Sequence, residues 1–271
     1  CITETVTGSI TVHPNHEITL DTGNDNTQSV CENTAIVDIQ YTLSEGATGV
    51  GFTTWTSVPA GGGDISAQVT FTLVGQTLTL AGTPSPAGLT TTTIYTYTVT
   101  TTGQIGVGNY CEAKTVTGTI TVLPDHKITL DSGNSTQEVC ESTAIVDIQY
   151  TLSEGATGVT AATWVQSPPG ANPIGRPGST QVTFTLDGLT LTLAGTPSPA
   201  GLTTTTIYTY TVTTTGSGSC ITETVTGSIT VHPNHEIVLD TGNDNTQSVC
   251  ENTAIVDIQY TLSEGATGVG F

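Results

Sequence analysis

Hydrophobic and polar residues alternate with a period of two over many short segments of the chain, the pattern of half-buried β-strands. The clearest segment is Ile94–Thr102, in which Tyr95, Tyr97 and Val99 share one face. Turns rich in Gly, Pro and Asn separate the segments, and no stretch favours a helix. In the first half of the chain the same alternation predicts further strands at Glu17–Leu20, Gln28–Cys31, Ile36–Leu43, Gly49–Val58, Val69–Leu73, Leu78–Leu80 and Thr115–Val122. About seven or eight short strands in series predict an all-β antiparallel sandwich.

Side chains on one face of each strand are the candidate core. In the segment Ile36–Leu43 that face holds Val37, Ile39, Tyr41 and Leu43. Trp55 and Trp164 stand at matching places and could be exposed platforms for glycans. A single Trp on a sandwich strand more often packs in the core, so we expect both to be core residues.

The pattern itself repeats, and the repetition defines the domains. Residues 220–271 repeat residues 1–52 with one change, Thr19 to Val238, and residues 111–158 follow the same text more loosely. Two non-identical repeats of about 110 residues, X and Y, therefore form a period of 219 residues. Repetition at a fixed period is typical of structural arrays, so we expect the chain to be part of a longer series.

Pro-containing joints at residues 12–16, 122–126 and 231–235 mark the predicted domain boundaries. Residues 1–14 would then be the last strand of a preceding sandwich, and residues 15–124 would be repeat X. Residues 125–233 would be repeat Y, and residues 234–271 would be the opening strands of a next X repeat, cut before it closes. A proline at each joint ends the last strand and leaves a short, stiff connection.

Composition excludes several classes of protein. The chain has 23 acidic residues and only 3 basic ones, a net charge of −20, so it lacks the basic patches that nucleic acids require. No apolar run reaches the roughly 20 residues that span a bilayer, so we expect no membrane insertion in this segment. Regular β-branched alternation argues against disorder despite the charge.

Six cysteines, Cys1, Cys31, Cys111, Cys140, Cys220 and Cys250, fall at two matching positions per repeat. This regularity predicts a disulfide framework and an oxidising, extracellular compartment. The absence of any CxxC pair argues against a zinc ribbon or a thioredoxin-like site.

Two ordered motifs resemble a known family. They are residues 28–41 (QSVCENTAIVDIQY) and residues 78–103 (LTLAGTPSPAGLTTTTIYTYTVTTTG), the second followed by Cys111 and by GTITV at 118–122. Together they resemble the PKD-like, immunoglobulin-like repeats of very large secreted surface proteins of Bacteroidota, such as the SprB-type gliding-motility adhesins. The resemblance implies tandem immunoglobulin-like (PKD- or cadherin-like) sandwiches in a linear array. It also implies type 9 secretion, attachment at the cell surface and a role in adhesion, gliding or extracellular filaments, and it carries no catalytic residues across.

First and last strands are neighbours in immunoglobulin-like sandwiches, which favours the disulfides Cys31–Cys111 and Cys140–Cys220 within single repeats. Cys1 and Cys250 would then bond to neighbouring repeats. Antiparallel topology could instead place the intended partners at opposite ends of a sandwich, beyond the usual Cα separation of about 4.4–6.8 Å. Bridges to a neighbouring domain or to another chain are the alternative.

An oxygen-rich loop at residues 21–26 recurs at 240–245, beside the joint residues Glu17 and Glu236. Such loops can hold Ca²⁺, which accepts 6–8 oxygen ligands. The candidate ligands are Glu17, Asp21, Asn24, Asp25, Glu236, Asp240 and Asp244. Repeat Y loses one carboxylate and has Lys127 in place of Glu17, which favours the alternative of an Asx-rich turn that satisfies its own backbone. No cofactor is required.

His13 and His16 have the appearance of a metal-binding pair, repeated as His232 and His235, whereas repeat Y keeps only His126 at its start. Because a proline separates the two histidines, we expect a solvated joint instead.

No nucleophile elbow, phosphate-binding glycine loop or pair of catalytic carboxylates is recognisable, so we expect no enzyme activity. The leading hypothesis is a structural repeat region of an extended, homo-oligomeric extracellular fibre, whose partners are other copies of the chain. The alternative is a multivalent adhesin whose repeats bind glycans or solid surfaces through many weak contacts. A third option is a spacer that projects a distant tip.

Overall fold

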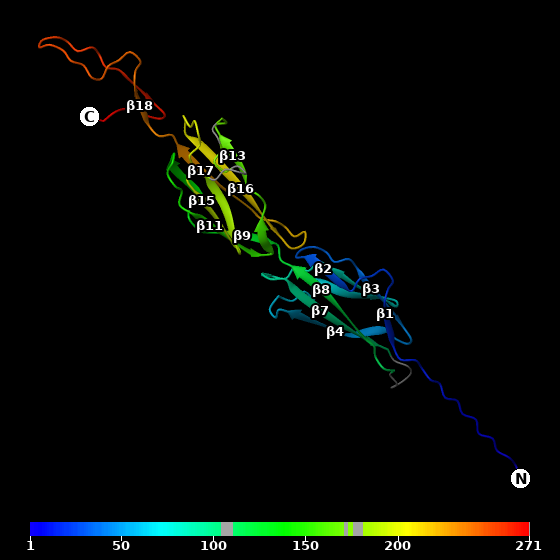
Figure 1. Cartoon of the computed structure of the whole chain (residues 1–271). Helices are drawn as coiled ribbons and strands as arrows, with labels where there is room; N and C mark the ends of the chain where they lie inside the picture. The colour runs from blue at the N-terminus through cyan, green and yellow to red at the C-terminus, as the bar shows by residue number, and fades with distance from the viewer. Residues whose placement is uncertain (104–110, 171–172, 176–180, 271) are drawn as a thin grey trace. The chain divides into compact units, whose positions relative to one another are not determined.

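The computed structural model describes residues 1–103, 111–170, 173–175 and 181–270. In these residues every assigned element of regular secondary structure is a β-strand. They form two compact units, Cys1–Asp125 together with Ser217–Ile221, and His126–Gly216 together with Thr222–Phe271 (Figure 1). Within the described ranges, no helix has the length and apolar character that crossing a bilayer demands.

The first unit is a sandwich of two four-stranded sheets, ordered β1-β3-β6-β5 and β2-β8-β7-β4 (Figure 1). Its strands are β1 (Glu17–Leu20), β2 (Thr27–Cys31), β3 (Ile39–Ser44), β4 (Gly49–Val58), β5 (Val69–Val74), β6 (Thr77–Gly82), β7 (Thr93–Thr102) and β8 (Thr115–Leu123). The order matches an immunoglobulin sandwich, in which strands A, B, E and D face strands C, F and G. The predicted all-β, immunoglobulin-like fold is therefore confirmed.

The second unit repeats this arrangement, with sheets β14-β15-β11-β9 and β10-β17-β16-β12 and with β13 also paired to β16. Its strands are β9 (His126–Ser132), β10 (Thr136–Cys140), β11 (Ile148–Glu154), β12 (Ala156–Val159), β13 (Thr163–Ser167), β14 (Val182–Asp187), β15 (Thr190–Gly195), β16 (Thr206–Gly216) and β17 (Thr224–His232). Beyond them, β18 (Glu236–Leu239) and β19 (Tyr260–Ser263) form a separate antiparallel pair.

The predicted buried faces mostly lie in the core. Tyr95, Tyr97 and Val99 of β7 are fully buried, as their alternation predicts. The hydroxyls of Tyr97 and Tyr41 lie 2.8 Å apart, so the two polar ends in this apolar interior satisfy each other. Tyr150 and Tyr210 form the same pair at 2.8 Å in the second unit.

Val37 is an exception to the predicted core, because its side chain is 76% exposed while Ile36 beside it is buried. The side-chain amide of Gln28 explains the difference, since it donates to the Val37 carbonyl (2.8 Å) and accepts from the Val37 N–H (2.9 Å). These bonds hold the Val37 backbone outside any strand. The regular alternation of β3 therefore begins only at Ile39.

The strands are not all antiparallel. β2 pairs with β8 in parallel, with Cys31 opposite Leu123, and β10 pairs with β17 in the same way, with Cys140 opposite His232. β1 instead pairs with β3 in the other sheet. The chain thus changes sheet between β1 and β2, at the turn following Leu20, where Gly23 adopts a positive φ of 87°.

Both tryptophans contribute to the core, as predicted. Trp55 is half-buried, and its ring centroid lies 5.5 Å from that of Tyr97 and 6.3 Å from that of Phe71. Trp164 packs on Tyr210 and Phe184 in the same manner. Such tilted aromatic pairs stabilise a core beyond simple area burial.

Candidate functional site: the cysteines and the joint residues

A disulfide joins Cys31, at the end of β2, to Cys220, in the loop between β16 and β17. The Cα atoms are 5.3 Å apart, and 189 residues separate the two cysteines in sequence. The loop residues Ser217–Ile221 belong to the first compact unit, although both flanking strands belong to the second. The disulfide therefore connects repeat X to a loop of repeat Y.

This disulfide overturns both favoured pairings, Cys31–Cys111 and Cys140–Cys220, and leaves Cys111 and Cys140 as free thiols. The parallel pairing of β2 and β8 is the physical reason. Cys31 lies opposite Leu123 at the end of β8, whereas Cys111 precedes the first residue of β8, Thr115. At about 3.3 Å per residue, Cys31 lies roughly 26 Å along the strand from Thr115, far beyond disulfide reach. The alternative of a bridge to a neighbouring repeat is the one observed.

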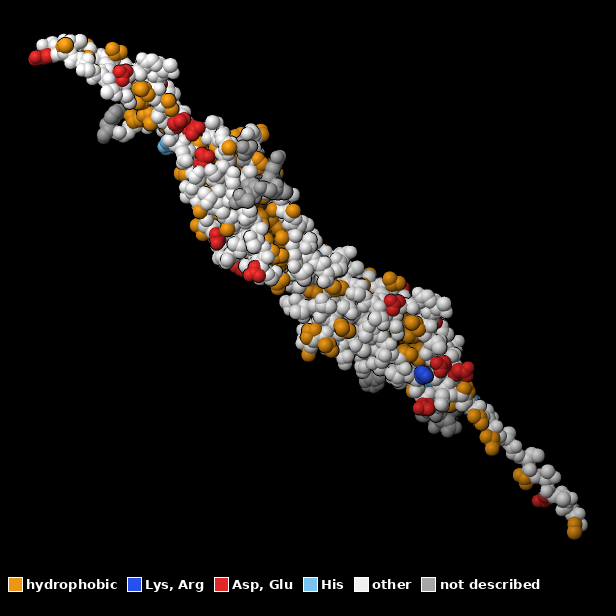
Figure 2. Space-filling model, viewed as in Figure 1, with side chains coloured by type: hydrophobic (Ala, Val, Ile, Leu, Met, Phe, Trp, Pro, Cys, Tyr) orange, Lys and Arg blue, Asp and Glu red, His pale blue; other side chains and the backbone are white. Residues whose placement is uncertain are grey.

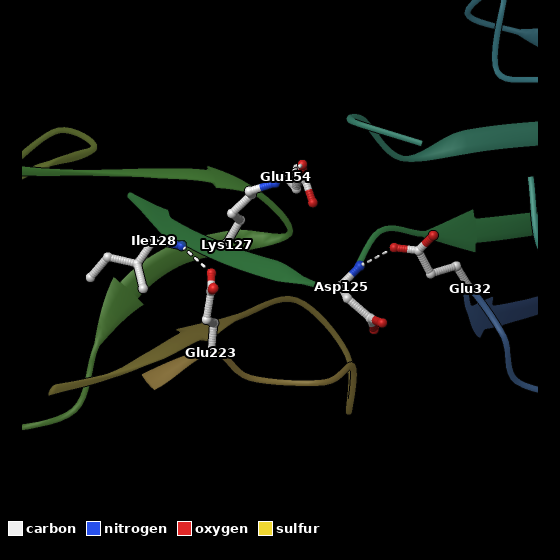
Figure 3. Close-up of polar contacts among 6 residues, drawn as sticks. All are labelled: Glu32, Asp125, Lys127, Ile128, Glu154 and Glu223. Atoms are coloured by element: carbon white, nitrogen blue, oxygen red, sulfur yellow. Dashed lines mark hydrogen bonds and ion pairs between the residues drawn. The ribbon is translucent and has the colours of Figure 1, made fainter. Parts of the chain in front are cut away.

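Hydrogen bonds around Asp125 hold the disulfide loop in place. The Ile221 N–H donates to the Asp125 carboxylate (2.9 Å), and the Asp125 N–H donates to the Glu32 carboxylate (2.9 Å, Figure 3). The Glu32 N–H in turn donates to the Leu123 carbonyl at 2.8 Å. Charge-assisted bonds of this kind are stronger than neutral ones. The loop is thus anchored both covalently and by carboxylates.

The second unit has its own carboxylate contacts beside the joint. The Glu223 carboxylate accepts from the Ile128 N–H at 2.7 Å, and Lys127 lies 3.7 Å from the Glu154 carboxylate (Figure 3). The Lys127 side chain is about half exposed, so its ion pair contributes little.

Two of the histidines at the joints contradict the expectation of a solvated segment, and two do not. His16 and His126 are buried, whereas His13 and His235 are exposed. The His16 Nδ1 lies 3.2 Å from the Thr101 hydroxyl, and its Nε2 has no hydrogen-bond partner among the described residues.

A glycine at the end of the opposing strand makes room for each buried ring. A Cβ built on Gly103 would lie 2.9 Å from His16 Nε2, and one on Gly216 would lie 2.7 Å from His126 Nε2. Each glycine also lies against a backbone carbonyl, that of Gly46 for Gly103 and that of Gly155 for Gly216, so the strand end, the turn and the histidine are closely packed.

The calcium candidates do not gather around a common point. Asp21 accepts from the Thr42 hydroxyl (2.7 Å), Asp25 accepts from the Thr27 N–H (2.8 Å), and the Asn24 side chain accepts from the Gln40 N–H (2.9 Å). Asp240, Asp244 and Asn243 repeat these three bonds. Glu236 accepts from the Ser263 hydroxyl at 3.0 Å. Within the described ranges, no group of three or more His, Cys, Asp or Glu could hold a metal ion. The arrangement favours the Asx-rich turn, and calcium binding stays an untested prediction.

On the face in Figure 2, white side chains and backbone predominate, orange hydrophobic side chains are scattered among them, and acidic groups appear as small clusters. The perturbed tyrosines lie in the core, where burial raises the pKa of Tyr208 to about 12. Burial, followed by the hydrogen bond to Tyr41, raises the pKa of Tyr97 still more, so these hydroxyls stay neutral.

Comparisons with known proteins assign no family and no function to the chain. No family model and no curated protein matches the chain. A mutated variant of three immunoglobulin domains of titin covers 93% of this chain and 88% of its own, at 10% identity and a TM-score of 0.47. Mouse protocadherin-24 EC1–3 covers 82% of this chain and 72% of its own, at 11% identity and a TM-score of 0.38. An endo-fucoidan hydrolase is more distant, with a TM-score of 0.25 and 29% of its length covered. The fold assignment rests on the sheet topology described above.

Proposed function

We propose that the chain is a structural stretch of a very large secreted protein, whose immunoglobulin-like repeats form an extended surface fibre used in adhesion, gliding or cell contact. The observation that carries the proposal is the Cys31–Cys220 disulfide between the consecutive, related repeats X and Y. A disulfide of this kind is typical of an extracellular compartment. A covalent bond between repeats limits how far they can be pulled apart, which suits a protein that carries tension.

The connection between the repeats supports the same proposal. β8 ends at Leu123 and β9 begins at His126, so Pro124 and Asp125 alone connect the last strand of X to the first strand of Y. Proline restricts its own backbone, and Asp125 is engaged by both Ile221 and Glu32. The proline ring and these two hydrogen bonds therefore restrict the backbone of both residues, Pro124 and Asp125.

Other copies of the chain are the proposed partners. Nearly identical repeats present the same surface at a regular interval, and repeated contacts that do not close produce open filaments. The net charge of −20 opposes lateral association, so salt or divalent cations should promote it by screening.

Electron microscopy and sedimentation of the purified chain at increasing salt test this function. We expect regular filaments or lateral bundles whose mass increases with salt, and no retention on a glycan array by a monomeric chain. Glycan binding by the monomer, without assembly at any salt concentration, would instead support the adhesin alternative.

A further inference from the structure

Two cysteine types recur along the chain. Strand-end cysteines close β2 and β10 and are Cys31 and Cys140, with Cys250 at the same position of the repeated sequence. Loop cysteines precede β8 and β17 and are Cys111 and Cys220, with Cys1 at the same position of the repeated sequence. The observed disulfide joins a strand-end cysteine of repeat X to the loop cysteine of the repeat that follows. We propose that this pairing is a rule, so that consecutive repeats are joined by a directional series of disulfides.

Cys140 has the same surroundings as Cys31. Each lies at the end of a strand in parallel pairing with the last strand of its own repeat, opposite Leu123 for Cys31 and His232 for Cys140. The carbonyl of each accepts from a threonine N–H three residues later, at 3.1 Å in both repeats. The residue directly after each cysteine donates its N–H to the last strand, Glu32 to the Leu123 carbonyl and Glu141 to the His232 carbonyl, at 2.8 Å in both repeats. Cys140 is nevertheless an exposed thiol.

Cys111 has the same surroundings as Cys220. The residue after each loop cysteine donates its N–H to a joint side chain, Glu112 to Asn15 at 3.2 Å and Ile221 to Asp125 at 2.9 Å. Asn15 and Asp125 both precede the buried histidine of their repeat, so these two bonds are equivalent.

The position of the Cys111 sulfur indicates where its partner would lie. Cys111 Sγ lies 3.7 Å from the carbonyl of His13, the residue equivalent to Leu123. Leu123 is the cross-strand neighbour of Cys31, the residue that bonds to Cys220. Cys111 thus faces the point where a strand-end cysteine of a repeat before X would arrive.

The rule assigns a cross-linking site to each of these two thiols. Cys140 bonds to the loop cysteine of a complete repeat placed after Y, and Cys111 bonds to the strand-end cysteine of a complete repeat placed before X. In each case two thiols lose two electrons and two protons as the S–S bond forms, and the S–S bond of a disulfide oxidant is reduced to two thiols. The rule is independent of whether the chain assembles into fibres.

The test extends the chain by appending residues 53–233 after Phe271, which completes the third repeat and adds a fourth. Cys111→Ser in the original copy and Cys140→Ser in the appended copy leave one cysteine with each of these two flanking sequences. After oxidation with oxidised glutathione, cleavage at glutamate releases Cys140 between Glu138 and Glu141, and mass spectrometry identifies its partner. We expect complete loss of the free Cys140 thiol and a bond to the appended copy of Cys111.

A matched control, Cys140→Ser, should leave the appended Cys111 thiol free while the Cys31–Cys220 disulfide persists. The unextended chain keeps the proposal testable if the longer one fails to fold. In it, Cys31→Ser should expose Cys220 as an additional free thiol, with no new bond from Cys220 to Cys140. A Cys140 thiol that stays free in the folded extended chain, or that bonds within its own repeat, overturns the rule.

Discussion

Repeats X and Y share a core and differ at their edges. The tyrosine pair, the tryptophan packed on a phenylalanine and the sheet order recur in both. The edge strand that pairs with β7 in X, or with β16 in Y, differs between the repeats. In X it is the single strand β4, with a register shift between Val50 and Thr53, whereas in Y it is divided into β12 and β13. The division falls at the place of that shift, so the fold tolerates irregularity where the strand forms the sheet edge.

The comparison also separates what each repeat needs in order to fold from what connects it to its neighbours. X has Leu123 beside its strand-end cysteine and Glu17 at its first strand, whereas Y has His232 and Lys127 at those places. The core residues are close copies while the joint residues vary. Substitutions in the core should therefore have equal effects in X and Y, and substitutions at the cysteines and joint should not.

The largest expected effect, equal in both repeats, is that of Gly82→Ala in X and Gly195→Ala in Y. A Cβ at these positions would lie 2.0 Å from the carbonyl oxygen of Gln68 or Gln181, and the φ angles are +144° and +138°. We expect each substitution to unfold its repeat, a loss of more than about 4 kcal/mol, in thermal melts followed by circular dichroism. Gly75→Ala, at a positive φ with open space, is the control and should cost only about 1–2 kcal/mol. Unequal losses in X and Y would contradict the conclusion that the two cores are equivalent.

Removal of the disulfide should distinguish the repeats instead. Cys31→Ser should lower the free energy of unfolding of the first unit by roughly 2–5 kcal/mol, since it frees a long loop in the unfolded chain. Cys140→Ser removes a free thiol and should change stability by less than about 0.5 kcal/mol.

A tryptic digest without reductant provides the accompanying check. Trypsin cleaves after Lys114 and Lys127, whereas Pro177 blocks cleavage after Arg176, so fragments 1–114 and 128–271 should migrate as one species in the parent chain and separately in Cys31→Ser. Separate migration in the parent chain would contradict the pairing.

Tyr97→Phe in X and Tyr210→Phe in Y should each cost about 1–3 kcal/mol, because the partner hydroxyl of Tyr41 or Tyr150 is left buried and unpaired. Urea unfolding measures the loss. The double variant Tyr41→Phe/Tyr97→Phe should recover most of it, because both polar ends are then absent. A double variant as unstable as the sum of the singles would show that the hydroxyls act independently.

Alkaline pH should weaken both repeats together. Burial raises the folded-state pKa of Tyr208 to about 12 in Y and raises that of Tyr95 in X. The unfolded chain releases these protons near pH 10, so stability is fully present below that pH and falls as pH rises towards the folded pKa. Melting temperatures measured from pH 8 to 12, with free thiols alkylated, should be level at first and then decline. A decline that begins below pH 9 would point to other groups.

The smallest expected effect is at the joint of Y alone. Lys127→Ala removes the partly exposed pair with Glu154 and should cost less than about 1 kcal/mol, and less still at high salt. In X, Glu17 and Glu45 occupy the equivalent positions, so Glu17→Lys should stabilise by a similar small amount. A loss of stability in that variant would show that the two joints differ in more than charge.

Period-two alternation was sufficient to predict the strands and most of the core, because burial of one face controls register in a sheet. It failed where a side chain intervenes, as when Gln28 binds the Val37 backbone and delays β3. It also gave no sign that Thr27–Cys31 leaves the sheet of β1 to pair in parallel with β8, which moved Cys31 away from Cys111. Cysteine pairing depends on which strand ends meet, and spacing along one chain does not determine that. The buried His16 depends likewise on a distant glycine, Gly103.

The Cys31–Cys220 disulfide has a mechanical consequence. Tension applied to the two ends of the chain would pass from one sulfur to the other and bypass most of the 189 residues between them. Fully stretched, that interval would measure on the order of 600 Å, and all of it is withheld from extension while the bond is intact. A series of such repeats under tension would release this length only where the surroundings become reducing, even after a sandwich has unfolded.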